Sequence, residues 1–196
     1  MDILSLPIED APFSILDVET TGFSPKFGDK ICEIAILRIE GEKEKIFHSL
    51  INPGFKIPEK VKSIHGITDD MVSSAPYFIE VIEDILNILK DSCIVGHNIY
   101  FDIEFLKNEM GDEFKRIERN PVIDTLKISK VYLNQPSNSL KNLTYSLGLG
   151  GGIFHRALED VYKTKNLLFY IIEHLRKRNF NLKTLSDLFE IQFVKF

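Results

Sequence analysis

The first third of the sequence contains three strand-like segments. After them, amphipathic stretches typical of helices alternate with two shorter apolar runs. A short apolar run such as residues 13–18, FSILDV, is typical of a central strand that is covered on both faces. The other expected strands are residues 31–39, 45–51, 93–95 and 122–123, with a turn at Gly41-Glu42 between the second and third. This order of strands and helices predicts an α/β fold with a mixed sheet.

Five helices are expected around this sheet. Apolar residues recur at helical spacing after Pro76 and form one stripe. Asp124 and Ser139 stand where an N-cap would begin a helix, and Gly111 and Gly148 stand where a helix would end. The expected helices span residues 78–89, 99–110, 125–133, 140–147 and 157–177.

The composition is that of an ordinary soluble domain. A chain of 196 residues can hold a core of its own, and its 44% hydrophobic and 27% charged content excludes bulk disorder. No apolar stretch approaches the roughly 20 residues of a membrane-spanning helix, and the acidic, proline-broken start is unlike a secretory signal. Cys32 and Cys93 lie in apolar segments, so we expect buried free thiols and a cytoplasmic protein.

Charge is uneven along the chain. The formal net charge is −5, yet residues 174–196 hold five basic and two acidic side chains. The acidic body predicts weak binding to nucleic acid unless a partner tethers the chain, or unless Arg156, Lys141 and the basic tail line the strand path. We divide the chain into a main domain, residues 1–178, and a short tail, residues 179–196.

The tail is too apolar to float free, so we expect it to pack back on the domain or to dock on a partner. Its apolar side chains include Leu185, Leu188, Phe189, Phe193 and Phe196. Residues 185–189 faintly resemble a sliding-clamp-binding pentapeptide but lack the leading glutamine, and helix packing is the favoured interpretation.

Two carboxylates end the first predicted strand, in the segment DVETTG at residues 17–22. Side chains alternate along a strand, so Asp17 and Glu19 project to the same side. Such a pair is costly at the end of an apolar strand unless a cation neutralises it. On this spacing alone, a polar turn at Glu19 and an edge carboxylate at Asp17 remain an equal alternative.

A second cluster is HNIYFD at residues 97–102. Asp102 falls in the first turn of a predicted helix, where the helix dipole favours a negative charge. Taken singly, Asp102 is best interpreted as a helix-start residue, and His97 as a packed or capping histidine.

A third cluster follows a glycine-rich loop over residues 148–152. The loop leads to His155, and Asp160 falls in the first turn of the next helix. The loop could be a simple connector, but an imidazole on a mobile segment fits a general base that approaches a reaction centre. No GxxxxGK[ST] pattern is present, so the glycines do not indicate a nucleoside triphosphate site.

Together the three clusters supply four carboxylates and one imidazole. Asp17, Glu19, Asp102 and Asp160 carry a formal charge that two divalent cations would cancel. Hard oxygen ligands select Mg²⁺ or Mn²⁺ over zinc. Without metal, the carboxylates would repel one another and some would take up protons.

The segments DVETTG, HNIYFD and HRALED (residues 155–160) resemble, in order and spacing, the three motifs of the DEDDh family of 3′→5′ exonucleases. IHGIT at residues 64–68 and IDT at residues 123–125 are similar to further family landmarks, and the resemblance covers about residues 13–175. His155, five residues before Asp160, specifies the histidine group rather than its tyrosine sister group.

The resemblance implies a ribonuclease-H-like fold, with a mixed five-stranded sheet flanked by helices. It also implies two-metal hydrolysis of terminal phosphodiesters, with release of nucleoside 5′-monophosphates. Asp17 would bridge two Mg²⁺ or Mn²⁺ ions, Glu19, Asp102 and Asp160 would complete their ligation, and His155 would take the proton from the attacking water.

The resemblance also implies a set of contacts to the terminal nucleotide. These residues are Thr20, Gly22, Ile64, His65, Asn98 and Phe101. Two of them have a structural alternative: Phe101 could stack on a base or pack in the core, and His65 could brace its own turn. Asp124 is interpreted as an N-cap rather than a metal ligand.

The expected substrates are single-stranded or frayed 3′ ends of DNA, because DVETTG and IHGIT look most like epsilon-type domains of bacterial DNA polymerase III. A polymerase or a sliding clamp is the protein partner considered, and no membrane contact is expected. The alternatives are an RNA-trimming 3′→5′ exoribonuclease, a hydrolase of small nucleotides, and a non-catalytic nucleic-acid-binding domain of the same fold.

Overall fold

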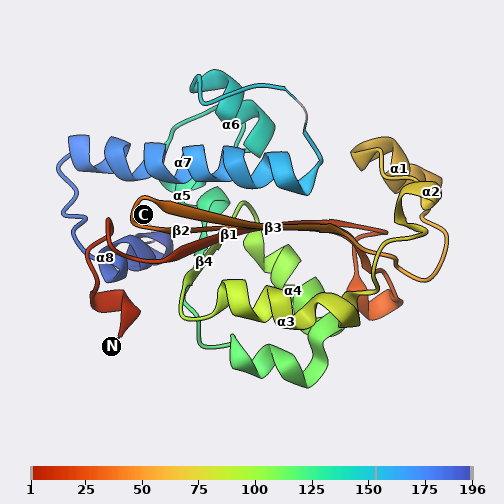
Figure 1. Ribbon diagram of the computed structural model, residues 1–196. Coiled ribbons are helices and arrows are strands. Elements are labelled where there is room, and N and C mark those ends of the chain that lie inside the picture. The colour runs from red at the N-terminus through yellow and green to blue at the C-terminus, as the bar shows by residue number, and fades with distance from the viewer. Residues whose placement is uncertain (1, 153, 195–196) are drawn as a thin grey trace.

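The computed structural model describes residues 2–152 and 154–194. A five-stranded sheet lies between two layers of helices, with α6 and α7 over one face and α3 and α4 over the other (Figure 1). Ile153, in the glycine-rich lead-in, and Phe196, in the tail, lie outside the described residues. The α/β fold with a mixed five-stranded sheet is therefore confirmed.

The strand order in the sheet is β3-β2-β1-β4-β5. The pairs β1–β2 and β2–β3 are antiparallel, whereas β1–β4 and β4–β5 are parallel. The strands are β1 Phe13–Thr20, β2 Ile31–Glu40, β3 Lys43–Leu50, β4 Cys93–Gly96 and β5 Val122–Asp124. Because β1 is central and longer than β4, its carboxyl end extends beyond the parallel pairing, which covers only residues 13–15 of β1.

Eight α-helices are described, of which three have the bounds that the sequence predicts. They are α1 Glu59–His65, α2 Asp69–Val72, α3 Phe78–Leu89, α4 Ile99–Met110, α5 Thr125–Tyr132, α6 Leu140–Ser146, α7 Ala157–Lys177 and α8 Leu185–Glu190. Short 3-10 turns lie at Ile3–Ser5, Pro25–Phe27, Gly111–Arg116 and Ile191–Phe193. The helices α1 and α2 were not predicted, because helices of seven and four residues are too short to show an apolar period.

Each face of the sheet has its own apolar core. One core joins alternate residues of the sheet, such as Ile15, to α7 and α8, and the other joins residues such as Leu16 to α3 and α4. This split follows from the alternation of side chains along β1. Cys32 and Cys93 are both buried and free, as predicted.

The described part of the tail packs against the main domain. Leu182, Leu185 and Leu188 are buried in the same core as α7. The backbone of the tail also pairs with the first residues of the chain, through an antiparallel bridge between Pro7 and Thr184. Phe193 differs from expectation, because its side chain is 55% exposed. Among the described residues, no helix has the length and apolar character needed to cross a membrane.

Candidate active site

Asp17 and Glu19 lie on the part of β1 that extends past β4, and both side chains are half-buried. Burial raises the pKa of Asp17 well above its usual value, and the negative charges of Asp102, Glu19 and Asp160 raise it further. The charges of three carboxylates thus act on Asp17, although the four groups come from three separate segments of the chain.

Asp102 reaches this cluster because β4 ends early. The chain leaves the sheet at Gly96 and begins α4 at Ile99, so Val18 of β1 has no partner in β4. Asp102 Oδ1 accepts the Val18 N–H at 2.9 Å instead. Asp102 is 5% exposed, and burial raises the pKa of its carboxyl group to about 8.

Glu19, His155 and Asp160 form the closest group of potential metal ligands among the described residues. Each offers one donor atom, and these atoms all lie within 4.8 Å of one another. Burial raises the pKa of Glu19 to about 8, with a further contribution from the charge of Asp160. Asp17 and Asp102 are not part of this close group.

The segment that carries His155 is tied to the first turn of α7. His155 N–H donates to Asp160 Oδ2 at 3.0 Å, and Lys163 Nζ pairs with Asp160 Oδ1 at 3.1 Å. Lys163 also lies 3.8 Å from the centre of the Phe154 ring. The His155 side chain is exposed, and its φ of +61° is in the left-handed region.

The donor set suits hard divalent cations. Donor atoms of Glu19, His155 and Asp160 converge within 4.8 Å, and the charges of Asp102, Glu19 and Asp160 act on the buried carboxyl group of Asp17, whose pKa is raised mainly by burial. Oxygen-rich sites of this kind are typical of Mg²⁺ and Mn²⁺. The residues therefore fit the metal ions that the sequence resemblance implies.

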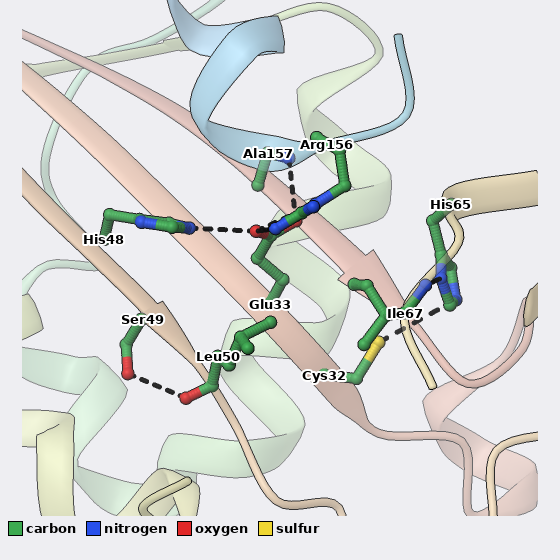
Figure 2. Close-up of polar contacts among 9 residues, drawn as sticks. All are labelled: Cys32, Glu33, His48, Ser49, Leu50, His65, Ile67, Arg156 and Ala157. Atoms are coloured by element: carbon green, nitrogen blue, oxygen red, sulfur yellow. Dashed lines mark hydrogen bonds and ion pairs between the residues drawn. The ribbon is translucent and has the colours of Figure 1, made fainter. Parts of the chain in front are cut away.

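Glu33 belongs to the same region and was missed by the sequence analysis. It lies on β2 directly opposite Glu19 and is fully buried. Figure 2 shows its carboxylate between His48, Arg156 and the backbone of Ala157. The signal was one acidic residue inside the apolar run ICEIAIL, since a buried charge requires a partner.

Residues expected to contact the nucleotide fall into two groups. Ile64 and Asn98 are exposed, and Phe101 is half-buried, with its ring 5.0 Å from that of Phe105. Thr20 and His65 are buried. Thr20 Oγ1 donates to Gly22 O at 2.6 Å, and His65 Nδ1 accepts the Ile67 N–H at 3.0 Å (Figure 2), so both side chains also support their own turns.

Gly22 leaves room for a neighbouring side chain. A Cβ atom at this position would collide with the Asp29 carboxylate, which accepts the Ser24 N–H and fixes the turn after β1. This close approach explains the glycine at the end of DVETTG without any reference to a ligand.

Two structural interpretations of polar residues are confirmed. The His97 ring lies 2.9 Å from Thr125 Oγ1 and 2.8 Å from Asn138 O, so it is a packed histidine. Asp124 caps α5 by accepting the Leu126 N–H at 2.9 Å.

Comparison with protein families gives one match that covers most of the chain. The sequence profile of the family described as Exonuclease (RNase_T) matches residues 14–168. The PolC-type DNA polymerase III of Thermotoga maritima is 39% identical over 173 residues, which cover 86% of this chain and 12% of that protein. The chain thus spans about an eighth of the length of this relative.

Other relatives are closer in length or share the same region. The DNA polymerase III subunit epsilon of Aquifex aeolicus is 35% identical over 173 residues, covering 85% of this chain and 83% of that protein. The 3′-5′ exonuclease DinG of Bacillus subtilis is 36% identical over 167 residues, covering 84% of this chain and 18% of that protein.

Solved structures with the same fold include nucleases bound to DNA. Exonuclease X in complex with 5′ overhanging duplex DNA is 25% identical, with a TM-score of 0.66 over 92% of this chain and 99% of that one. A zinc-bound complex of E. coli exonuclease I with single-stranded DNA is 21% identical, with a TM-score of 0.72 over 86% of this chain and 41% of that one. The latter likeness concerns the fold alone.

Proposed function

Because the chain belongs to the exonuclease (RNase_T) family, we propose that it is a 3′→5′ exonuclease that releases nucleoside 5′-monophosphates from 3′ ends of DNA. The observation that carries this proposal is the convergence of Asp17, Glu19, Asp102, Asp160 and His155 from three separate segments. A non-catalytic domain of this fold would have no need to keep all five groups together.

Asp17, Glu19, Asp102 and Asp160 are the residues that would hold two Mg²⁺ or Mn²⁺ ions. When bound, such a pair lowers the pKa of a water molecule and stabilises negative charge on a phosphodiester. The raised pKa values of Asp17, Glu19 and Asp102 support this assignment, because carboxylates that repel one another are stabilised by cations.

His155 would take the proton from the attacking water. A neutral imidazole has a ring nitrogen that can accept this proton near neutral pH. The ring is exposed to incoming substrate, yet one of its donor atoms lies within 4.8 Å of those of Glu19 and Asp160. Asp160 would thus serve twice, as a ligand and as the acceptor that orients the His155 backbone.

The terminal nucleotide would lie against the carboxyl end of β1. Ile64, Asn98 and Phe101 offer accessible surface there, whereas Thr20, Gly22 and His65 would shape the turn behind it. Single-stranded or frayed 3′ ends are the proposed substrates, and a polymerase is the proposed partner. The named relatives, a polymerase subunit and PolC-type polymerases, support DNA over RNA.

The proposal is tested with 5′-labelled single-stranded DNA and RNA of the same sequence, incubated with Mg²⁺, Mn²⁺ or EDTA. We expect a ladder that shortens from the 3′ end, faster on DNA and absent in EDTA. Internal fragments would indicate an endonuclease, and preferred cleavage of RNA would indicate an exoribonuclease. No cleavage of either polymer under any condition would contradict the proposal.

A further inference from the structure

Glu33 is a buried acidic residue that the proposed reaction does not use. Its side chain lies on β2 opposite Glu19 and is fully shielded from solvent. Like charges directly opposite in a sheet are destabilising, and a buried carboxylate costs free energy unless it is paired and hydrogen-bonded. The fold therefore needs strong compensation at this position.

Both carboxylate oxygens of Glu33 are bound by groups from other elements (Figure 2). Arg156 donates from Nη2 to Oε1 at 2.8 Å and from Nε to Oε2 at 3.1 Å, which is a two-point contact. The Ala157 N–H donates to Oε2 at 3.0 Å, and His48 Nε2 lies 2.9 Å from Oε1. Burial raises the pKa of Glu33, but the bonds from Arg156, His48 and Ala157 outweigh this effect and lower it overall.

Two of these partners form the beginning of α7. Arg156 is the N-cap residue of the helix and Ala157 is its first residue. An N-cap often satisfies the first free N–H groups of its helix with its own side chain. Here Arg156 makes no such bond, and a carboxylate from β2 takes the Ala157 N–H instead. Glu33 on β2 thus binds both the N-cap residue and the first residue of α7.

The two residues bound by Glu33 directly follow His155, which has an unusual backbone conformation. His155 has a φ of +61°, a conformation that costs about 1 kcal/mol or more for a non-glycine residue and persists only when its surroundings impose it. Its own N–H is held by Asp160, and the next two residues are held by Glu33. His155 therefore lies between two fixed points.

We propose that Glu33 is a positioning residue, which docks the start of α7 on β2 and thereby sets His155 and Asp160 against Glu19. It contacts neither substrate nor metal in this role, and it acts through Arg156 and Ala157. The inference rests on the proposed exonuclease function for its kinetic effect, but the docking itself does not depend on that function.

A second ion pair between α7 and the sheet provides a matched control. Lys165 Nζ lies 2.9 Å from Glu44 Oε1 on β3, and the Glu44 side chain is 42% exposed. Exposed pairs of this kind contribute little. Glu44→Gln makes the same chemical change as Glu33→Gln, on the same hairpin, without touching the start of the helix.

The kinetic test compares both variants on single-stranded DNA at saturating Mn²⁺. For Glu33→Gln we expect kcat to fall roughly tenfold to a hundredfold, because small misplacements of reacting groups have effects of this size. The KM should stay within about twofold, since the groups proposed to contact the nucleotide lie outside α7. Glu44→Gln should change neither value.

A double-variant cycle tests the route through Arg156. Arg156→Gln should lower kcat in the same way, and the combination with Glu33→Gln should add little to either single change. Arg156→Lys keeps the charge but loses the two-point contact, so its kcat should lie between those of the wild type and Arg156→Gln. Additive effects, or a rise in KM alone, would contradict the proposal.

Hydrogen exchange of the metal-free protein provides a readout that needs no activity. In EDTA, Glu33→Gln should accelerate exchange of the amides of residues 154–160, and Glu44→Gln should not. Wild-type exchange and wild-type kcat in Glu33→Gln would overturn the inference. If the wild type has no nuclease activity, the hydrogen-exchange result still decides whether Glu33 docks the start of α7. If Glu33→Gln does not fold, the same exchange measurement on Arg156→Lys tests the docking.

Discussion

Asp102 and Asp160 occupy the same kind of position, the first turn of a helix, but the two helices reach the site in different ways. Asp102 on α4 follows a short connection from β4, and its carboxylate accepts a backbone N–H of β1. Among the described residues, Asp160 on α7 has no bond to the sheet: its carboxylate accepts the N–H of His155 and pairs with Lys163, while the Glu33 side chain holds the start of α7.

The difference separates a fixed side of the site from an adjustable one. The Asp102 carboxylate is bound to the backbone of the central strand, so we expect its position to change only if the sheet itself moves. Side-chain pairs have several rotamers and can be replaced one at a time. We therefore expect variants on the α4 side to remove activity outright, and variants on the α7 side to change it by degrees.

Asp102→Asn should have the largest effect. Loss of a residue that acts within a catalytic unit lowers kcat roughly 10⁴-fold or more. The measurement is the rate of 3′ shortening of labelled DNA in Mn²⁺. Glu104→Gln, an exposed change two residues further along α4, is the control and should keep wild-type activity. A modest loss in Asp102→Asn would mean that the fixed side is not essential.

His155→Ala should come second. We expect turnover to fall roughly 10²–10⁴-fold, the range for loss of a general base. Metal binding should survive, because the four carboxylates are unchanged. Calorimetric titration with Mn²⁺ checks this, and loss of metal affinity in His155→Ala would show that His155 is a ligand rather than a base.

Lys163→Met should have a smaller effect than the two preceding variants, and it should strengthen metal binding. Removing a cation that pairs with Asp160 should tighten apparent Mn²⁺ binding by roughly threefold to tenfold, since one neighbouring charge contributes about 1 kcal/mol. Lys165→Met, two residues along the same helix and paired with Glu44, is the control. Weaker Mn²⁺ binding in Lys163→Met would show that Lys163 supports the site instead of competing with the metal.

A further effect, which needs no substitution, is on the stability of the metal-free protein. Glu19 and Asp102 have pKa values of about 8 in the folded state, above those of unfolded carboxylates. The folded state therefore binds more protons, and stability should fall as the pH rises from about 4 to 8. Each kcal/mol lost lowers Tm by roughly 2–4 °C for a chain of this size.

Thermal unfolding in EDTA at pH 6 and pH 8 measures this loss, and Asp102→Asn should flatten it. Added Mn²⁺ should restore Tm at pH 8, because a bound ion stabilises the folded state by mass action. A Tm that is higher at pH 8 than at pH 6 in EDTA would mean that the carboxylates are compensated by groups of the chain itself.

The same contrast explains what the sequence could predict. Asp102 and Val18 meet because a long strand lies beside a short one; the apolar runs at residues 13–18 and 93–95 indicate the two lengths, whereas the strand order comes from the structure. The helix that carries Asp102 and the cap of α5 at Asp124 were also predicted from the sequence.

The α7 side was less predictable. Glu33 is a single acidic residue in an apolar run, and nothing local shows whether such a residue pairs across 123 positions of sequence with Arg156. From the sequence, Arg156 was considered only as one of several basic residues that could line the path of a nucleic-acid strand, and its contact with Glu33 was not predicted. Lys163 lies on the buried side of α7, where it pairs with Asp160 of its own helix and lies over the ring of Phe154, a contact that the helical pattern does not predict.

The bridge between Pro7 and Thr184 brings the two ends of the described chain together, beside the last turn of α7, where Arg176 pairs with Glu9. A 21-residue helix is about 30 Å long, so this junction is a full helix length from His155. The first described residues and α8 lie at the opposite end of the molecule from the start of α7 (Figure 1). A tag or carrier fused ahead of Pro7 would therefore extend from the end of α7 that is remote from His155 and Asp160.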